Sequence, residues 1–166
     1  MGEYQTVRHT FEPVWNAQSE ILILGTFPSV KSRENQFYYG HPQNRFWKLL
    51  AAVYRETEPK TIDEKKSLVL RHRLAVWDVI GQCDIIGSAD SSIRNVVATD
   101  IAGLLKVSGI HTILANGAKA YALYRQHQLE KTGIEAVKLP STSPANAVWT
   151  LERLREVWGR ELLAQK

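Results

Sequence analysis

Two patterns of hydrophobic and polar residues alternate along this chain. Runs rich in consecutive apolar residues, of which residues 21–24 form the clearest, are typical of strands buried on both faces of a sheet. Gly25 and Pro28 interrupt the first run. The predicted strands cover residues 20–28, 74–81, 110–117 and 134–140.

Between these runs, apolar residues recur at helical spacing, which predicts amphipathic helices. Thr61 and Glu64 have the spacing of a capping box at a helix start. The predicted helices cover residues 44–55, 61–73, 90–96 (capped by Asp90 or Ser91), 99–109 (capped by Thr99 or Asp100 and ending at Gly109), 118–128 and 150–163.

Strands that alternate with helices predict βαβ units, and hence an α/β fold with a mostly parallel sheet and helices on both faces. In such a sheet, the ligand crevice lies at the carboxyl ends of the strands. Turn-forming and hydrogen-bonding residues follow three of the predicted strands, in segments 26–29, 116–117 and 141–146. We expect these segments to meet at one edge of the sheet.

Length and composition predict a single domain that covers residues 1–166, since a domain typically has about 100–200 residues. The apolar content of 44% and the charged content of 23% exclude disordered and fibrous classes. Cys83 is the single cysteine, which excludes an internal disulfide and a site built from several thiolates. The histidines are scattered without ligand spacing, so we expect no metal.

The first residues and the apolar runs favour a cytoplasmic protein. Residues 1–15 lack the apolar region of a signal peptide, and every apolar run is too short to span a bilayer. A lone cysteine fits a reducing compartment. The formal net charge of +4 is compatible with a polyanionic partner but does not require one.

The most unusual stretch is the long segment 25–47, which follows the first predicted strand and leads into a helix. Such loops are usually functional. Adjacent Tyr38 and Tyr39 precede Gly40 and His41, and an aromatic face suits stacking on a flat ligand such as a base. Asn44, at the helix start, can cap the helix or present its amide to a ligand.

This stretch resembles the first motif of the uracil-DNA glycosylase superfamily, with a Gly-x-x-Pro turn at residues 25–28 and the sequence His-Pro-Gln-Asn-Arg-Phe-Trp at residues 41–47. Residues 141–146, Ser-Thr-Ser-Pro-Ala-Asn, resemble the superfamily's second motif, whose loop inserts into DNA. Residues 25–29, residues 38–44 and the pair Trp77-Asp78 most resemble the hypoxanthine-DNA (deoxyinosine) glycosylase branch. It implies a three-layer α/β/α sandwich with a four-stranded parallel sheet.

The resemblance also implies roles for individual residues. Many superfamily members carry Asp or Asn in the first turn to handle the attacking water, whereas this chain has Phe27 there. In the branch that it resembles, the catalytic residue is the asparagine of His-Pro-x-Asn, here Asn44. The implied base-binding residues are Phe27 and Ser29 through backbone N–H groups, Tyr39 through stacking, His41 and Asn116. The implied DNA-binding residues are Ser141, Thr142, Ser143, Pro144 and Asn146.

The implied reaction is the extrusion of a deaminated base from DNA and hydrolysis of its N-glycosidic bond, by a monomer and without a cofactor. Lys31 is the single lysine in the two motifs, so we expect no Schiff-base lyase step. An amide is not a strong base, and Asn44 would therefore orient the water rather than take its proton.

Other interpretations remain open at this stage. Asn44 could act only as a helix cap, and Glu34 could activate the water in its place. The chain could also be a nucleic-acid-binding or nucleotide-binding module without catalysis, although it lacks a phosphate-binding glycine motif. Residue patterns do not decide between hypoxanthine, uracil and xanthine.

Overall fold

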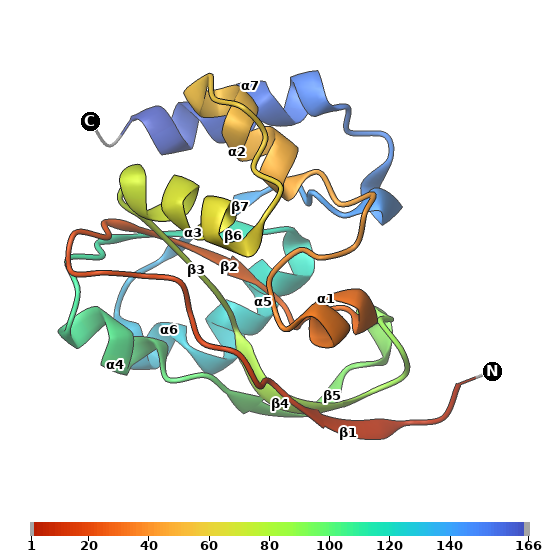
Figure 1. Ribbon diagram of the computed structural model, residues 1–166. Coiled ribbons are helices and arrows are strands. Elements are labelled where there is room, and N and C mark those ends of the chain that lie inside the picture. Colours follow the sequence, from red (N-terminus) through yellow and green to blue (C-terminus); the bar gives the residue numbers. More distant parts are fainter. Residues whose placement is uncertain (1, 165–166) are drawn as a thin grey trace.

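A computed structural model describes residues 2–164, and within them the strands form two sheets (Figure 1). The larger sheet is parallel and has the order β3-β2-β6-β7, and the smaller is antiparallel and has the order β1-β4-β5. The strands are β1 (Gln5–Arg8), β2 (Ile21–Gly25), β3 (Leu74–Asp78), β4 (Ile80–Ile85), β5 (Arg94–Ala98), β6 (Thr112–Asn116) and β7 (Ala136–Leu139).

The helices cover both faces of the parallel sheet, which confirms the predicted three-layer α/β/α fold. In Figure 1, α2, α3 and α7 lie above the sheet, and α4, α5 and α6 lie below it. The helices are α1 (Val30–Asn35), α2 (Phe46–Tyr54), α3 (Ile62–Arg71), α4 (Ile101–Lys106), α5 (Ala118–His127), α6 (Leu129–Thr132) and α7 (Leu151–Leu163), with short 3-10 helices η1 (Asp90–Ser92) and η2 (Pro144–Asn146).

Strand β2 shows why its continuous apolar run predicts a central strand. Ile21 and Ile23 pack into the core below α2 and α7, whereas Leu22 and Leu24 pack into the core on the opposite face. All four side chains are buried because successive residues of a strand point to opposite faces. The run therefore belongs to the middle of a covered parallel sheet.

Side-chain caps start several helices, and those of α3 and α4 were predicted. The backbone N–H of Glu64 donates to Thr61 Oγ1 at 3.0 Å, and the backbone N–H of Thr61 donates to Glu64 Oε1 at 3.0 Å, which completes the capping box of α3. Asp100 and Thr150 accept from the backbone N–H groups of Gly103 and Arg153 in α4 and α7. These bonds satisfy donors that the first helical turn leaves free.

The antiparallel sheet was not predicted, and the predicted helix over residues 90–96 is wrong. Its first residues form η1, and Arg94–Ala98 form β5, which pairs with β4. β-branched Val96 and Val97 suit a strand. The predicted strand over 74–81 is likewise divided into β3 and the start of β4.

Two further boundaries differ from the predictions. Helix α4 ends at Lys106 rather than Gly109, where the Ser108 hydroxyl donates to the Leu104 carbonyl at 2.9 Å and so satisfies a terminal acceptor. The segment 25–47 is not all loop, because Val30–Asn35 form α1, which Ser29 caps.

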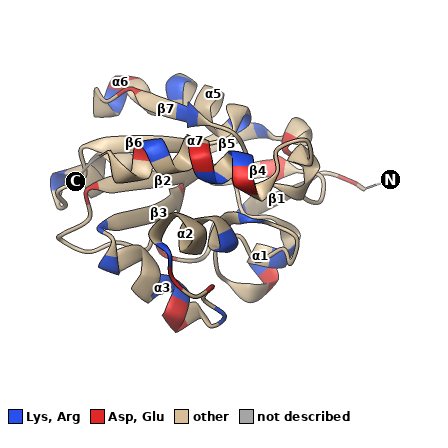
Figure 2. Ribbon diagram, turned by 90° about the horizontal axis from the view of Figure 1, so that it is seen from above, with Lys and Arg blue, Asp and Glu red and all other residues tan. Residues whose placement is uncertain are grey.

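Charged residues lie mainly on the outer helices, whereas central strands β2 and β6 carry none (Figure 2). No helix within residues 2–164 is long and apolar enough to cross a membrane.

Candidate active site

A cavity of about 240 Å³ lies at the carboxyl edge of the parallel sheet, where the predicted segments meet. Gly25, at the end of β2, pairs with Asp78 at the end of β3, and Asn116 ends β6 on the other side. The cavity is lined by Gly25, Thr26, Phe27, Pro28, Ser29, Ser32, Tyr38, Tyr39, His41, Asn44, Asp78, Ser88, Asp90, Asn116, Ser141, Thr142, Ser143 and Pro144. The expectation that segments after different strands converge at one edge is thus confirmed.

A chain of hydrogen bonds joins the two motifs across this cavity. The Thr142 hydroxyl donates to Asn44 Oδ1 at 2.8 Å and accepts from Asn116 Nδ2 at 3.0 Å. The Thr142 side chain is fully buried, and Asn116 is 9% exposed. Thr142, predicted to bind DNA, is therefore a link inside the site.

Backbone donors fix the direction of both amides. The Thr142 N–H donates to Asn116 Oδ1 at 3.0 Å, and the Phe46 N–H donates to Asn44 Oδ1 at 2.9 Å. A backbone N–H can only donate, so each bond places an amide oxygen at its end. Arg45 is the N-cap of α2, and the Asn44 oxygen accepts from the N–H of Phe46, the first residue of that helix; Asn44 Nδ2 donates to no group among residues 2–164. It can offer N–H donors to a ligand.

Tyr39 forms one wall of the cavity. Its ring is stacked on Phe46, with ring centroids 4.0 Å apart and planes at 25°, and the ring is only partly buried. Its φ of 53° is an unusual backbone conformation for a bulky residue and is typical of functional segments. The neighbouring Tyr38 instead lies in the core and donates its hydroxyl to the Glu12 carbonyl.

The turn after β2 offers backbone groups rather than side chains. The Phe27 side chain is buried, with an exposed fraction of 8%, against the ring of His9. The Ser29 hydroxyl accepts from the Ser32 N–H as the cap of α1. The backbone N–H groups of Phe27 and Ser29 have no acceptor within the described part of the chain, so they remain available to a ligand.

His41 lies exposed at the rim of the cavity. Its Nδ1 accepts from the Gln43 N–H at 3.1 Å, so Nε2 is the ring nitrogen available to a ligand. The predicted rival Glu34 is absent from the cavity lining and pairs with Lys31 on the surface at 3.5 Å.

The loop of the second motif is held by Arg45. Its guanidinium donates to the carbonyls of Ser143, Asn146 and Trp149, and its backbone N–H donates to the Thr142 carbonyl. Ser141, Ser143 and Pro144 line the cavity beside Thr142. The Asn146 amide turns back to the Ser141 carbonyl at 3.0 Å. One cation thus fixes the loop relative to Asn44.

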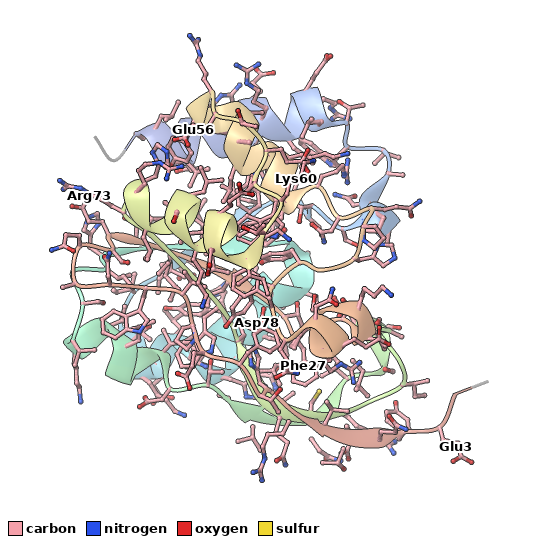
Figure 3. All side chains as sticks on the ribbon, viewed as in Figure 1. Glu3, Phe27, Glu56, Lys60, Arg73 and Asp78 are labelled. Carbon is pink, nitrogen blue, oxygen red and sulfur yellow. The ribbon has the colours of Figure 1, made fainter. Side chains whose placement is uncertain are left out.

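The sequence analysis did not identify His9 and Asp78 as site residues. Asp78 is 4% exposed and lines the cavity, and its Oδ2 lies 2.9 Å from His9 Nε2. Figure 3 labels Asp78 and Phe27 close to the middle of the molecule in that view, and both residues are buried. The available signal for Asp78 was the pair Trp77-Asp78, which resembles the hypoxanthine-DNA glycosylase branch. His9 carried none, because it lies 69 residues away.

No group of three His, Cys, Asp or Glu side chains that could hold a metal ion is found in residues 2–164.

The surroundings of the cavity differ in charge from its interior. A second hollow, next to the cavity at the ends of β6 and β7, is lined by Lys119, Lys138, Asn146 and Trp149 among others. Its two lysines suit an anionic ligand.

Comparisons with known proteins agree with this arrangement. The family model described as the uracil DNA glycosylase superfamily matches residues 12–160. A protein of Methanosarcina acetivorans named hypoxanthine DNA glycosylase is 36% identical over 152 residues, which cover 90% of this chain and 95% of that protein. A protein of the same name from Methanosarcina barkeri is 32% identical over 139 residues, which cover 82% and 86% of the two chains.

A solved structure has the same fold. The solution NMR structure of a candidate uracil DNA glycosylase from Methanosarcina acetivorans matches with a TM-score of 0.80 and 33% identity, covering 95% of this chain and 97% of that one. The match to the family model extends over most of the chain and includes both motifs and the residues between them. The chain therefore belongs to the uracil DNA glycosylase superfamily.

Proposed function

We propose that this protein is a DNA glycosylase that extrudes a deaminated base, preferentially hypoxanthine, and hydrolyses its N-glycosidic bond. The observation that carries the proposal is the hydrogen-bonded chain Asn44–Thr142–Asn116 in a cavity between the two motifs. The relatives named hypoxanthine DNA glycosylase support the choice of base.

The extruded base stacks on the free face of Tyr39, whose other face rests on Phe46. One N–H of Asn116 is bound to Thr142, and its second N–H is a donor for the carbonyl oxygen of the base. The backbone N–H groups of Phe27 and Ser29, together with Nε2 of His41 at the rim, add further hydrogen bonds. Such preorganised donors stabilise negative charge as it develops on a leaving base.

In the bond-breaking step, the C1′–N9 bond of deoxyinosine breaks and its electron pair stays with the base. A water oxygen forms the new bond to C1′, and its proton passes to solvent or to the departing base. Asn44 donates an N–H to one lone pair of this water and leaves the other for the attack. Since the Asn44 oxygen already accepts two hydrogen bonds, the residue orients the water and takes no proton.

The loop with Ser141, Ser143, Pro144 and Asn146 faces the duplex and holds the strand from which the base is extruded. Lys119 and Lys138 beside it attract the phosphate backbone. Among the described residues, the cavity lining contains no lysine, so the enzyme is monofunctional and acts by direct hydrolysis. Borohydride reduction during the reaction should trap no covalent adduct.

We also propose that the protein acts as a monomer in the cytoplasm. All groups assigned above come from one chain, and Cys83 is buried and free. Light scattering at assay concentration, with and without DNA, tests the monomer. A dimer on DNA would contradict it.

The test is base release. Duplex and single-stranded oligonucleotides that each carry one hypoxanthine, uracil or xanthine are incubated with enzyme, and free base and alkali-labile sites are measured. We expect hypoxanthine to be released and the other two bases to be released more slowly. Binding without release of any base, at stoichiometric enzyme, would favour a non-catalytic nucleic-acid-binding module instead.

A further inference from the structure

Asp78 and His9 form a buried pair at the floor of the cavity, and one carboxylate oxygen is left over. The two side chains are 5% and 4% exposed, and Oδ2 of Asp78 lies 2.9 Å from Nε2 of His9. No hydrogen bond to Oδ1 is found within residues 2–164, and Asp78 lines the cavity. An acceptor that is open to a cavity is suited to a donor on a bound ligand.

Gly25 brings this oxygen close to the base-binding groups. A Cβ on Gly25 would lie 2.5 Å from Asp78 Oδ1 and 3.0 Å from the Tyr39 hydroxyl. Any larger residue at position 25 would therefore force these two oxygens to move. The Tyr39 hydroxyl is buried and makes no hydrogen bond of good geometry within the described chain, although the Asn116 amide lies beside it. Burial, and then the negative charge of Asp78, raise the pKa of Tyr39 and outweigh the lowering by Asn116, so its hydroxyl stays a donor. The floor therefore presents an acceptor at Asp78 and donors at Tyr39 and Asn116.

We propose that Asp78 accepts a hydrogen bond from N1–H of the extruded hypoxanthine and thereby makes the site prefer hypoxanthine to uracil and adenine; this inference rests on the function proposed above. Asp78 takes no part in the covalent step. It acts as a specificity-determining residue, and His9 is its positioning residue.

The chemistry of the three bases explains the preference. In hypoxanthine, N1–H has one carbonyl and one C–H as neighbours, and the electrons of the broken bond enter the other ring. In uracil, N3–H lies between two carbonyls in the same ring that receives those electrons, so a carboxylate is repelled more strongly as the bond breaks. In adenine, N1 carries a lone pair, which a carboxylate acceptor repels.

His9 limits Asp78 to a single open oxygen. Its ring is held by Phe11 and Tyr38, at centroid distances of 4.5 and 5.8 Å, and its backbone N–H donates to the Gly81 carbonyl. A carboxylate with two free oxygens could pair with the adjacent N1–H and amino group of guanine, a normal base. Because Oδ2 is bound to His9, Asp78 cannot make this two-bond contact with guanine. His9 lies before the residues 12–160 that match the superfamily model, so this pair adds to the part that the model describes.

The experiment compares kcat/KM for hypoxanthine and uracil in the same oligonucleotide. Asp78→Asn keeps the shape and an acceptor oxygen but removes the charge. We expect hypoxanthine excision to fall and uracil excision to rise, so that the ratio falls by about tenfold or more, the equivalent of one favourable interaction. Asp63→Asn is the matched control, because Asp63 is exposed in the first turn of α3 and is absent from the cavity lining. Its ratio should equal that of the wild type.

A second pair of variants tests His9 and does not change Asp78. Gln can donate to the Asp78 oxygen from about the position of Nε2, so His9→Gln should keep the ratio, whereas His9→Phe should lower it as Asp78→Asn does. This arm decides the question if Asp78→Asn does not fold. A folded Asp78→Asn with the wild-type ratio, or equal ratios for His9→Gln and His9→Phe, would overturn the inference and leave the glycosylase function intact. Failure of the wild type to release any base would instead overturn the function itself.

Discussion

Two histidine–carboxylate pairs near opposite ends of β3 differ in their surroundings. At the carboxyl end, the His9 and Asp78 side chains are 4% and 5% exposed, and one carboxylate oxygen borders the cavity. At the amino end, the His72 and Glu56 side chains are 21% and 28% exposed, and Glu56 accepts hydrogen bonds from both His72 and Arg71. In Figure 3, Glu56 lies toward the outside of the molecule and Asp78 lies in its interior.

The difference separates a structural pair from one that can serve a ligand. Both oxygens of Glu56 bind protein partners, and the His72 ring is stacked on Tyr54 with centroids 3.8 Å apart. Nothing in that pair remains for a ligand, and water screens its charges. The Asp78 side chain is shielded from bulk water, and a protein group binds one of its two carboxylate oxygens. We therefore expect substitutions around the cavity to lower the rate of base excision. Substitutions around Glu56 should instead affect the stability of the fold, and only slightly.

The largest effect is expected for Asn44→Ser. A serine hydroxyl can accept from the Phe46 N–H as the Asn44 oxygen does, but serine has no amide N–H for the water and does not reach Thr142 in the same way. Loss of one preorganised group at the reacting centre lowers the rate by about 10²–10³-fold. Single-turnover excision of hypoxanthine measures this fall. The melting temperature should fall by no more than the equivalent of about 1–3 kcal/mol, because the buried Thr142 hydroxyl loses its acceptor.

The opposite outcome would identify Asn44 as a cap alone. In that case, Asn44→Ser would keep wild-type excision and Asn44→Ala would lower the melting temperature by the equivalent of about 1 kcal/mol. His41, at the rim of the same cavity, would then be the next residue to replace.

A fall of about 10²-fold is expected for Arg45→Gln, on duplex DNA in particular. Arg45 holds the loop of the second motif by three carbonyls, and a loop displaced by about 1 Å can cost this much in rate. Single-stranded substrate needs no extrusion from a duplex, so we expect a smaller loss there. Excision measured on both substrates gives the comparison.

Arg160→Lys is the control for that variant, since Arg160 is exposed on α7 and forms a surface ion pair with Glu156. It should leave both rates unchanged. Equal losses on duplex and single strand for Arg45→Gln would mean that the loop serves the cavity itself rather than the duplex.

A smaller loss, about tenfold in rate, is expected for Thr142→Val. Valine keeps the shape but leaves Asn44 Oδ1 and Asn116 Nδ2 without their shared partner. Unpaired buried groups also cost about 1–3 kcal/mol of stability, so the melting temperature should fall. Thr142→Ser retains the hydroxyl and should restore both properties. If it restores neither, the methyl group rather than the hydrogen bond is what matters.

The parallel sheet could be predicted because its strands are buried on both faces, as the runs at Ile21–Gly25 and Leu74–Asp78 make plain. The antiparallel sheet could not. Its outer strands Gln5–Arg8 and Arg94–Ala98 are largely exposed, so no apolar pattern distinguishes them from a helix or loop. A short edge strand is defined by its pairing with β4, a long-range contact that local patterns do not contain.

The candidate site divides in the same way. Asn44 and Thr142 lie in recognisable motifs, and the rule that ligands bind at the carboxyl ends of parallel strands brings the two motifs together. The bond from His9 to Asp78 joins residues that are far apart in the chain, and it depends on how the small sheet packs against the large one. The burial of Thr142 also escaped prediction, because its motif resembles an exposed loop.

The smallest effect is expected for Glu56→Gln, which tests the other end of β3. Hydrogen bonds from Arg71, and then from His72, lower the pKa of Glu56, so folding favours its charged form. Its contribution is therefore present above the ordinary pKa of glutamate, about 4.3, and is lost as pH falls through the lower pKa of the folded state. Because the pair is largely exposed, we expect the free energy of unfolding of the wild type to exceed that of the variant by less than about 1 kcal/mol at pH 7. Urea unfolding at pH 7 and pH 3 should show this difference shrinking in acid, with hypoxanthine excision at pH 7 unchanged. A difference that grows in acid would reverse the assigned sign, and a loss of excision at pH 7 would show that the two ends of β3 are not independent.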